Sequence, residues 1–296
     1  MKRILIAALA IVMVFALAAC TGSDTASPTP DNPDNTPDPN ITDPVVPEPD
    51  GINGPEDLTG KKVAVQDETT ADESLTALQE AGLDVEIIRY PQIINCFDDL
   101  NLGRVDAVYV DSVVAAFYTT DSDTFTRVWL SDEAEPLGIC LKKGSEELRD
   151  AIDAAVDMLY YNGTMAEIAY RHFGNDFEPA RTVLSEPTIP EISDDLLRTA
   201  GLLSIGCEIG YPPMEYLDTD GRTPIGFDID VGAAIAELLG LEPLVIDTAW
   251  DGIFAGVDRG DYDCIISSVS ITPARLEAYL FTQPYVANAL CIVVKN

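Results

Sequence analysis

The chain contains the stretch IISSVSITPAR at residues 265–275, where an apolar run meets serine side chains and then a Thr-Pro helix start. The apolar run predicts a strand over 263–267, and a helix beginning near Thr272 would direct its partly positive end at the preceding serines. Arg275 adds a planar guanidinium that can hold a carboxylate through two charge-assisted hydrogen bonds. The stretch therefore predicts the end of a strand in an α/β fold, with an arginine placed to hold an acid.

Strand and helix signals alternate in both halves of the chain. Apolar and β-branched runs predict strands over 62–66, 85–88, 106–110, 138–142, 202–206, 244–247 and 263–267. Helical spacing, often closed by glycine, predicts helices over 71–81, 98–102, 148–161, 165–173, 228–239 and 252–257, with one more beginning at Asp111. This alternation is typical of βαβ units and of a mostly parallel sheet.

The first residues form an export signal. Lys2 and Arg3 precede an apolar run that ends in Leu17-Ala18-Ala19-Cys20. This run is shorter than the ~20 apolar residues of a spanning helix, so residues 1–19 are predicted to be a signal peptide. The sequence before Cys20 resembles the lipobox of bacterial lipoproteins, which implies lipidation of Cys20 and anchoring to the cell membrane. An ordinary signal peptide that happens to contain a cysteine is the alternative.

Residues 20–56 are predicted to be a disordered tether between anchor and folded protein. They are rich in Asp, Pro, Thr, Ser and Asn and have few apolar side chains to bury. The aspartates there lack the glycine and terminal glutamate of a calcium loop, so no metal is expected. The remaining length fits one two-lobed protein or two small domains.

The charge balance argues against a nucleic-acid partner. The 296 residues include 51 acidic and 17 basic side chains, for a formal net charge of −34. Binding phosphates requires lysine and arginine, so the composition instead indicates a soluble exported surface or a field that attracts cationic ligands.

Five cysteines remain when Cys20 is set aside, at no metal-ligand spacing. Most lie in apolar runs and are expected to be small buried side chains. A disulfide between Cys140 and Cys291 is an open alternative if the two strands that cross between lobes lie side by side.

Several stretches together resemble one family. Residues 206–215, 226–230, 248–252 and 265–275 in the late half, and 66–71, 103–111 and 138–145 in the early half, are similar to bacterial extracellular solute-binding proteins of the polar amino-acid type. The resemblance implies family 3 of these proteins and the two-lobed α/β fold of type 2 periplasmic-binding proteins. Four late matches in one order over about 80 residues are a stronger signal than a single motif.

The order of the halves is reversed relative to that family, which predicts a circular permutant in which lobe 2 precedes most of lobe 1. The expected division is lobe 2 at 57–132, a return segment of lobe 1 at 133–175, a joining loop at 176–196, and the main part of lobe 1 with the first crossover strand at 197–296. The crossover strand would then dock in lobe 2 without a covalent bond to Leu58. A looser hinge, or a homodimer that exchanges lobes, follows as an expectation.

The resemblance assigns a role to each site residue. It implies that Arg275, Ser270 and Thr70 bind the carboxylate of an amino acid, that Asp111 pairs with its ammonium, and that Tyr211 and Trp250 form an aromatic wall. The residues also have plainer explanations. Both aromatics could be core residues, Arg275 could pair with Glu277, and Asp111 could simply cap its helix.

Ligand identity depends on Glu208, which the resemblance places beside Ser267 and Ser268 at the ligand side chain. An acid there favours a polar and cationic amino acid such as arginine or lysine, with cystine and glutamine as alternatives. Glu68 replaces the usual family glycine, and it either brings another carboxylate to the cleft or distorts or shields the loop.

The expected function is capture by lobe closure for the permease of an ABC importer, without a cofactor. The sequence offers no nucleophile–base pair, and its one histidine, His172, falls at a packing position, so no enzyme is expected. Two alternatives stay open: a ligand sensor without a transport role, and an enzyme on the same scaffold, similar to the cyclohexadienyl dehydratases.

Overall fold

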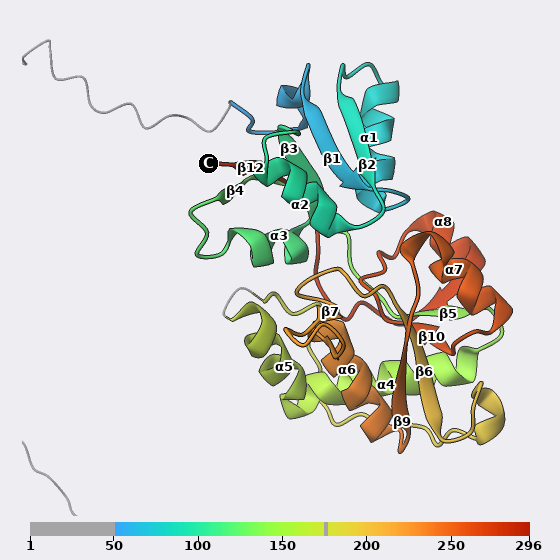
Figure 1. Cartoon of the computed structure of the whole chain (residues 1–296). Helices are drawn as coiled ribbons and strands as arrows, with labels where there is room; N and C mark the ends of the chain where they lie inside the picture. Colours follow the sequence, from blue (N-terminus) through green and yellow to red (C-terminus); the bar gives the residue numbers. More distant parts are fainter. Residues whose placement is uncertain (1–50, 175–176) are drawn as a thin grey trace, which may run out of the picture. The chain divides into compact units, whose positions relative to one another are not determined.

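The computed structural model describes residues 51–174 and 177–296, all within one compact unit that holds two five-stranded sheets (Figure 1). The predicted signal peptide, Cys20 and most of the tether lie outside the described residues. None of the described helices is long and apolar enough to cross a membrane.

The sheet of lobe 2 has the order β2-β1-β3-β12-β4. Strands β1 (Lys62–Gln66), β2 (Glu86–Tyr90) and β3 (Ala107–Asp111) are parallel. Strand β12 (Leu290–Lys295), from the far end of the sequence, is inserted antiparallel between β3 and β4 (Phe125–Leu130). β12 is more than 150 residues away in the chain from the two strands that flank it.

Alternation along the strands sorts side chains to the two faces of this sheet. Ile292 and Val294 join the cluster of helix α1 (Thr70–Glu80), whereas Cys291 and Val293 join the cluster of α2 (Ile93–Asn101) and α3 (Ser112–Thr119). The α1 cluster also contains Ile52 and Leu58, the latter closing the short helix η1 (Pro55–Leu58). Helices therefore cover both faces.

The sheet of lobe 1 has the order β11-β5-β10-β6-β9. Strands β6 (Leu202–Cys207), β9 (Glu242–Asp247) and β10 (Cys264–Ile265) are parallel, while β5 (Cys140–Lys142) is antiparallel to β10, and β11 (Tyr279–Phe281) to β5. Helices α4 (Glu146–Asn162), α5 (Thr164–Phe173) and α6 (Phe227–Leu238) pack on one face, and α7 (Trp250–Arg259) on the other. The remaining elements are η2 (Asp194–Leu196), the hairpin β7 (Tyr216–Leu217) and β8 (Pro224–Ile225), and α8 (Pro273–Ala278).

Two segments cross between the lobes, and they are paired with each other. The first runs from β4 to β5 and the second from β11 to β12. Leu137 donates its backbone N–H to Val286 at 3.1 Å, and Glu135 donates to Asn288 at 2.7 Å.

The structure corrects the cysteine alternative. Cys140 pairs with Phe281 inside the lobe 1 sheet, and Cys291 pairs with Val110 and Leu130 inside the lobe 2 sheet. The crossing segments do lie side by side, but the two cysteines flank opposite ends of the paired stretch. Both thiols are buried and free, as are the other cysteines among the described residues.

The expected elements are present, with two informative differences. Helix α2 begins at Ile93, earlier than the expected 98, because Ile93 and Phe97 extend its buried stripe. The edge strand β4 was not expected at all, and its half-buried residues lack a clear alternation. Each sheet is mixed because the crossing strands enter it antiparallel.

Candidate ligand-binding site

One cavity between the lobes contains about 300 Å³ of space, part of it open to solvent. Nine of its lining residues are those expected from the sequence: Thr70, Asp111, Glu208, Tyr211, Trp250, Ser267, Ser268, Ser270 and Arg275. Gln66, Thr69 and Glu215 complete the lining. The structure therefore brings all nine expected residues to a single place.

The fold positions these side chains at the carboxyl ends of parallel strands, where ligands bind in open α/β sheets. Asp111 ends β3, and Thr70 begins α1 just after β1. Glu208 directly follows β6, and Ser267 follows β10. Arg275 lies in α8, whose N-cap Thr272 accepts a hydrogen bond from the Arg275 backbone N–H.

Arg275 is held against the cavity by its neighbours. Its Nη1 donates to the Ser270 carbonyl at 3.1 Å, and its guanidinium lies 5.6 Å from the Trp250 ring centroid and 5.1 Å from that of Phe254. Burial lowers the pKa of this guanidinium, while the acids Glu73, Glu135 and Asp111 act in the opposite direction. In the described part of the chain no ion pair joins it to Glu277, so the plainer explanation for Arg275 is not favoured.

Asp111 is a buried carboxylate with two partners. Tyr211 Oη donates to its Oδ2 at 2.6 Å, and Asn288 Nδ2 donates to its Oδ1 at 2.6 Å. Burial raises its pKa, which these two hydrogen bonds and Arg275 partly offset. Although Asp111 occupies the N-cap position of α3, its side chain makes no capping hydrogen bond, so it does not simply cap the helix.

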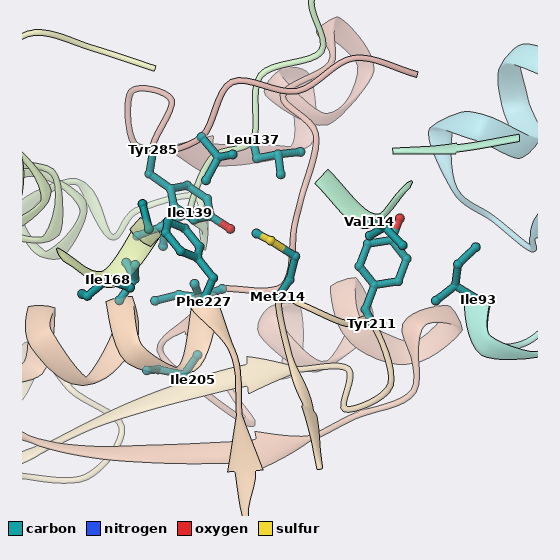
Figure 2. Close-up of a cluster of buried hydrophobic side chains, with 14 of the residues drawn as sticks. Ile93, Val114, Leu137, Ile139, Ile168, Ile205, Tyr211, Met214, Phe227 and Tyr285 are labelled. Atoms are coloured by element: carbon teal, nitrogen blue, oxygen red, sulfur yellow. The ribbon is translucent and has the colours of Figure 1, made fainter. Parts of the chain in front are cut away.

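Tyr211 is both a core residue and a lining residue. It is 7% exposed and belongs to the largest apolar cluster, where Figure 2 displays it close to Val114 of α3. Its hydroxyl reaches the cavity and bonds Asp111. The plain core interpretation of Tyr211 is thus correct for its ring and incomplete for its hydroxyl.

Glu208 is another buried acid of the cavity. Both of its carboxylate oxygens lie within hydrogen-bond distance of Gln66 Nε2, at 2.9 and 2.8 Å. Burial raises the pKa of Glu208 to about 7, against the effect of that amide. Ser267 accepts from the Glu208 backbone N–H and donates to Glu215, so this serine positions two acids.

Ser268 is tied to a third buried acid. Its backbone N–H donates to Asp228 Oδ2 at 2.8 Å, and Tyr285 Oη donates to Asp228 Oδ1 at 2.7 Å. Burial raises the pKa of Asp228 to about 6. Ser268 has φ of 49°, a left-handed conformation that this contact fixes.

Glu68 lies beside the cavity without its side chain entering it. The side chain is exposed, whereas its backbone carbonyl accepts from Trp250 Nε1 at 3.0 Å. Its φ of 59° is the left-handed conformation that favours glycine. Of the two expectations for Glu68, the structure favours a constrained loop over an added cleft carboxylate.

The sequence analysis missed three lining residues, Gln66, Thr69 and Glu215, and also Glu135, which lies outside the lining. Gln66 and Glu215 lie inside the stretches 66–71 and 206–215 that carry the resemblance, but the sequence analysis assigned neither of them a role in the site. Within residues 51–174 and 177–296, the buried side-chain atoms without a hydrogen-bond partner are Gln66 Oε1, Glu135 Oε2 and Glu215 Oε2. All three are acceptor oxygens, two of them on residues that line the cavity.

Sequence comparison finds relatives over part of the chain. The model of the bacterial extracellular solute-binding proteins, family 3, matches residues 203–296. A probable amino-acid ABC transporter-binding protein of Haemophilus influenzae is 37% identical over 106 residues, which are 36% of this chain and 40% of that protein. The L-arginine-binding protein of Pseudomonas aeruginosa is 38% identical over 135 residues, or 42% of this chain and 51% of that protein. The chain thus spans about half, or less, of these curated relatives.

Solved structures give shorter matches. The arginine-bound domain 1 of TmArgBP is 31% identical, with 32% of this chain and 81% of that chain covered and a TM-score of 0.29. The L-cystine solute receptor of Neisseria gonorrhoeae is 35% identical, with 26% of this chain and 33% of that chain covered and a TM-score of 0.25. Residues 203–296 of this chain are therefore similar to the bacterial extracellular solute-binding proteins of family 3.

Proposed function

We propose that this protein captures a polar, cationic amino acid between its lobes and delivers it to an ABC importer. The observation that carries the proposal is one cavity that gathers Arg275, Asp111 and Glu208 from separate elements. A relative named as an L-arginine-binding protein supports the cationic ligand class, whereas one named as an L-cystine-binding protein supports cystine as a competitor. Cystine and glutamine remain the competing ligands.

The ligand would be anchored at its two charged backbone groups. Its carboxylate pairs with the Arg275 guanidinium and accepts from Ser270 and Thr70, whose hydroxyls lie 3.4 Å apart across the cleft. Its ammonium donates to Asp111, whose position Tyr211 and Asn288 fix. Each lobe supplies part of the anchor, so a ligand stabilises the state in which both lobes meet it.

The distal part of the ligand would lie toward Glu208. Gln66 Oε1 and Glu215 Oε2 are buried acceptors without a donor in the described chain. A buried acceptor is costly unless a donor reaches it, so a ligand ending in an ammonium or guanidinium fits this end better than one ending in an acid.

We also propose that the segment order is a circular permutation. Supporting this, β12 completes the lobe 2 sheet, and its Ile292 and Val294 pack in the cluster that contains Leu58. The Leu58 region is where the family's chain would continue from the crossover strand. A homodimer with exchanged lobes stays a prediction, which light scattering would decide.

Lipidation of Cys20 belongs to the same proposal, since a tethered binding protein stays near its permease. The lipobox-like Leu17-Ala18-Ala19-Cys20 supports it. Labelled fatty acid should be incorporated by the parent chain and lost in Cys20→Ala. Equal labelling of both would contradict the anchor.

A binding experiment tests the function. The full chain is screened by thermal shift against the twenty amino acids, and the best ligand is titrated by calorimetry. Arg275→Ala should weaken binding by about 100-fold, because truncating one partner of a buried charge pair leaves the other unpaired. Arg259→Ala is the matched control, since this exposed arginine pairs only with Asp261 among the described residues.

Tight binding of an acidic amino acid, with none of a basic one, would overturn the cationic assignment. Turnover of prephenate or arogenate by the chain would replace binding with catalysis. A ligand-dependent interaction with a kinase or cyclase and none with a permease would favour the sensor alternative.

A further inference from the structure

Glu135 lies in the crossing segment, next to the ammonium anchor of the proposed site. Its backbone N–H donates to the Asn288 carbonyl at 2.7 Å, and the side-chain amide of Asn288 donates to Asp111 at 2.6 Å. Two residues further on, Leu137 forms an isolated bridge with Ser270. Glu135 is not among the residues that line the cavity, but its segment is bonded to Asn288, the partner of Asp111, and continues to the bridge with Ser270.

The surroundings of the Glu135 carboxylate are those expected for a ligand carboxylate. Its Oε2 is buried and has no hydrogen-bond partner in the described chain. Burial and then Asp111 raise the pKa of Glu135 to about 7, whereas hydrogen bonding by Thr70 and Ser270 and the charge of Arg275 lower it. Thr70, Ser270 and Arg275 are the three residues that the proposed function assigns to the ligand's acid.

We infer that Glu135 supplies from within the chain the negative charge that an amino acid would bring to Arg275, so that the site also accepts carboxylate-free cations. The ligand class is the α,ω-diamines and amino-guanidines that match cationic amino acids in length. This inference rests on the proposed function and extends it.

The physical reason is the charge balance at this end of the cavity. In a clamp with no internal acid, a ligand without a carboxylate would leave the half-buried Arg275 unpaired, which is strongly unfavourable. Here Glu135 already acts on that guanidinium, as Glu73 and Asp111 also do. An incoming carboxylate, by contrast, meets Glu135 and Asp111 as like charges, and like charges disfavour each other at short range.

The ammonium end of a diamine gains from the same arrangement. Asp111 and Glu135 are two buried carboxylates near this end of the site, and Glu135 Oε2 has no hydrogen-bond partner in the described chain. At the other end, Glu208 and the free oxygens of Gln66 and Glu215 face the distal cation. Cationic groups at both ends of the ligand are therefore matched by buried acceptors.

The test compares each amino acid with its decarboxylated form. Lysine against cadaverine, and arginine against agmatine, are titrated into the full chain, purified in detergent, at about pH 8, where Glu135 is mostly ionised. The amine is expected to bind within about tenfold of its parent amino acid. An amine weaker by more than that overturns the inference while leaving amino-acid capture intact.

Glu135→Gln gives the second arm. Removing the internal charge should shift the ratio of amine to amino-acid affinity by at least about tenfold toward the amino acid. Glu133→Gln, an exposed neighbour on the same segment, is the matched control and should leave the ratio unchanged. An unchanged ratio in Glu135→Gln, with amino-acid binding retained, overturns the role of Glu135.

Failure of the proposed function gives a different result. In that case neither lysine nor arginine binds the parent chain, and the amines do not bind either. Binding of the amines alone would support the inference and replace the amino acid as the ligand.

Discussion

Glu68 occupies a backbone conformation in which most residues are strained. Its φ is 59°, and its carbonyl is held by the Trp250 indole of the opposite lobe. The exposed side chain makes no contribution to the cavity lining. The residue therefore influences the site through its backbone, in keeping with the loop alternative of the sequence analysis and not with an added cleft carboxylate.

Glu68→Gly should raise the free energy of unfolding by about 0.5–1 kcal/mol, because glycine adopts the left-handed region without a steric cost. Urea denaturation monitored by circular dichroism measures the change. Glu68→Ala is the control, since it removes the charge and keeps the Cβ. If alanine stabilises the chain as much as glycine does, the effect comes from charge and the strain argument fails.

Glu208 makes stability depend on pH. Burial raises its pKa from 4.5 to about 7. Between these values the folded chain binds more protons than the unfolded chain, so the free energy of unfolding falls as the pH rises. Glu208→Gln should reduce this fall in the free energy of unfolding by about 2–3 kcal/mol. The substituted side chain still has an oxygen that can accept from Gln66 Nε2.

Urea titrations at pH 5 and pH 8 on both chains measure this effect. Glu135 and Asp228 have raised pKa values as well, so the Glu208→Gln variant retains part of the pH dependence. A fall as steep in Glu208→Gln as in the parent would place the dependence on those other acids.

At the level of elements, β12 joins the two ends of the sequence. It lies between β3 and β4 in the lobe 2 sheet, and its register shifts by a bulge between Ile292 and Val293. Ile292 is fully buried, although it comes more than 150 residues after the other strands of its sheet. The stability of lobe 2 therefore depends on the last strand of the chain.

Ile292→Ala should lower the free energy of unfolding by about 2–5 kcal/mol, because it opens a cavity in a packed core. Lys295→Ala, on an exposed residue of the same strand, should change it by no more than about 0.5 kcal/mol. Equal, small effects of both substitutions in chemical denaturation would indicate that β12 does not dock in the sheet as described.

At the scale of the whole molecule, direct hydrogen bonds already join the lobes across the cavity. Gln66 with Glu208, Tyr211 with Asp111, and Trp250 with Glu68 each pair one lobe with the other. A ligand must fit among these inter-lobe hydrogen bonds or replace some of them. The binding affinity therefore reflects the contacts that the ligand makes minus the inter-lobe contacts that it displaces. This exchange is why single anchors such as Arg275 cannot be assigned a fixed share of the binding energy.

The sequence by itself determined the periodic elements and the positions of the expected site residues. Alternation and helical spacing depend on near neighbours in the chain, and the quoted stretches placed nine side chains that the structure gathers around one cavity. Edge strand β4 was not predicted, because an edge strand is half exposed and needs no regular alternation of apolar and polar residues.

Only the tertiary structure decided what depends on distant segments meeting. It paired the crossing segments yet placed Cys140 and Cys291 in different sheets, and it joined Glu135 through its backbone to Asn288, the partner of Asp111. Burial and the fields of neighbouring charges arise from this packing. Local sequence does not contain them, so the unpartnered oxygens of the cleft could be found only in the folded chain.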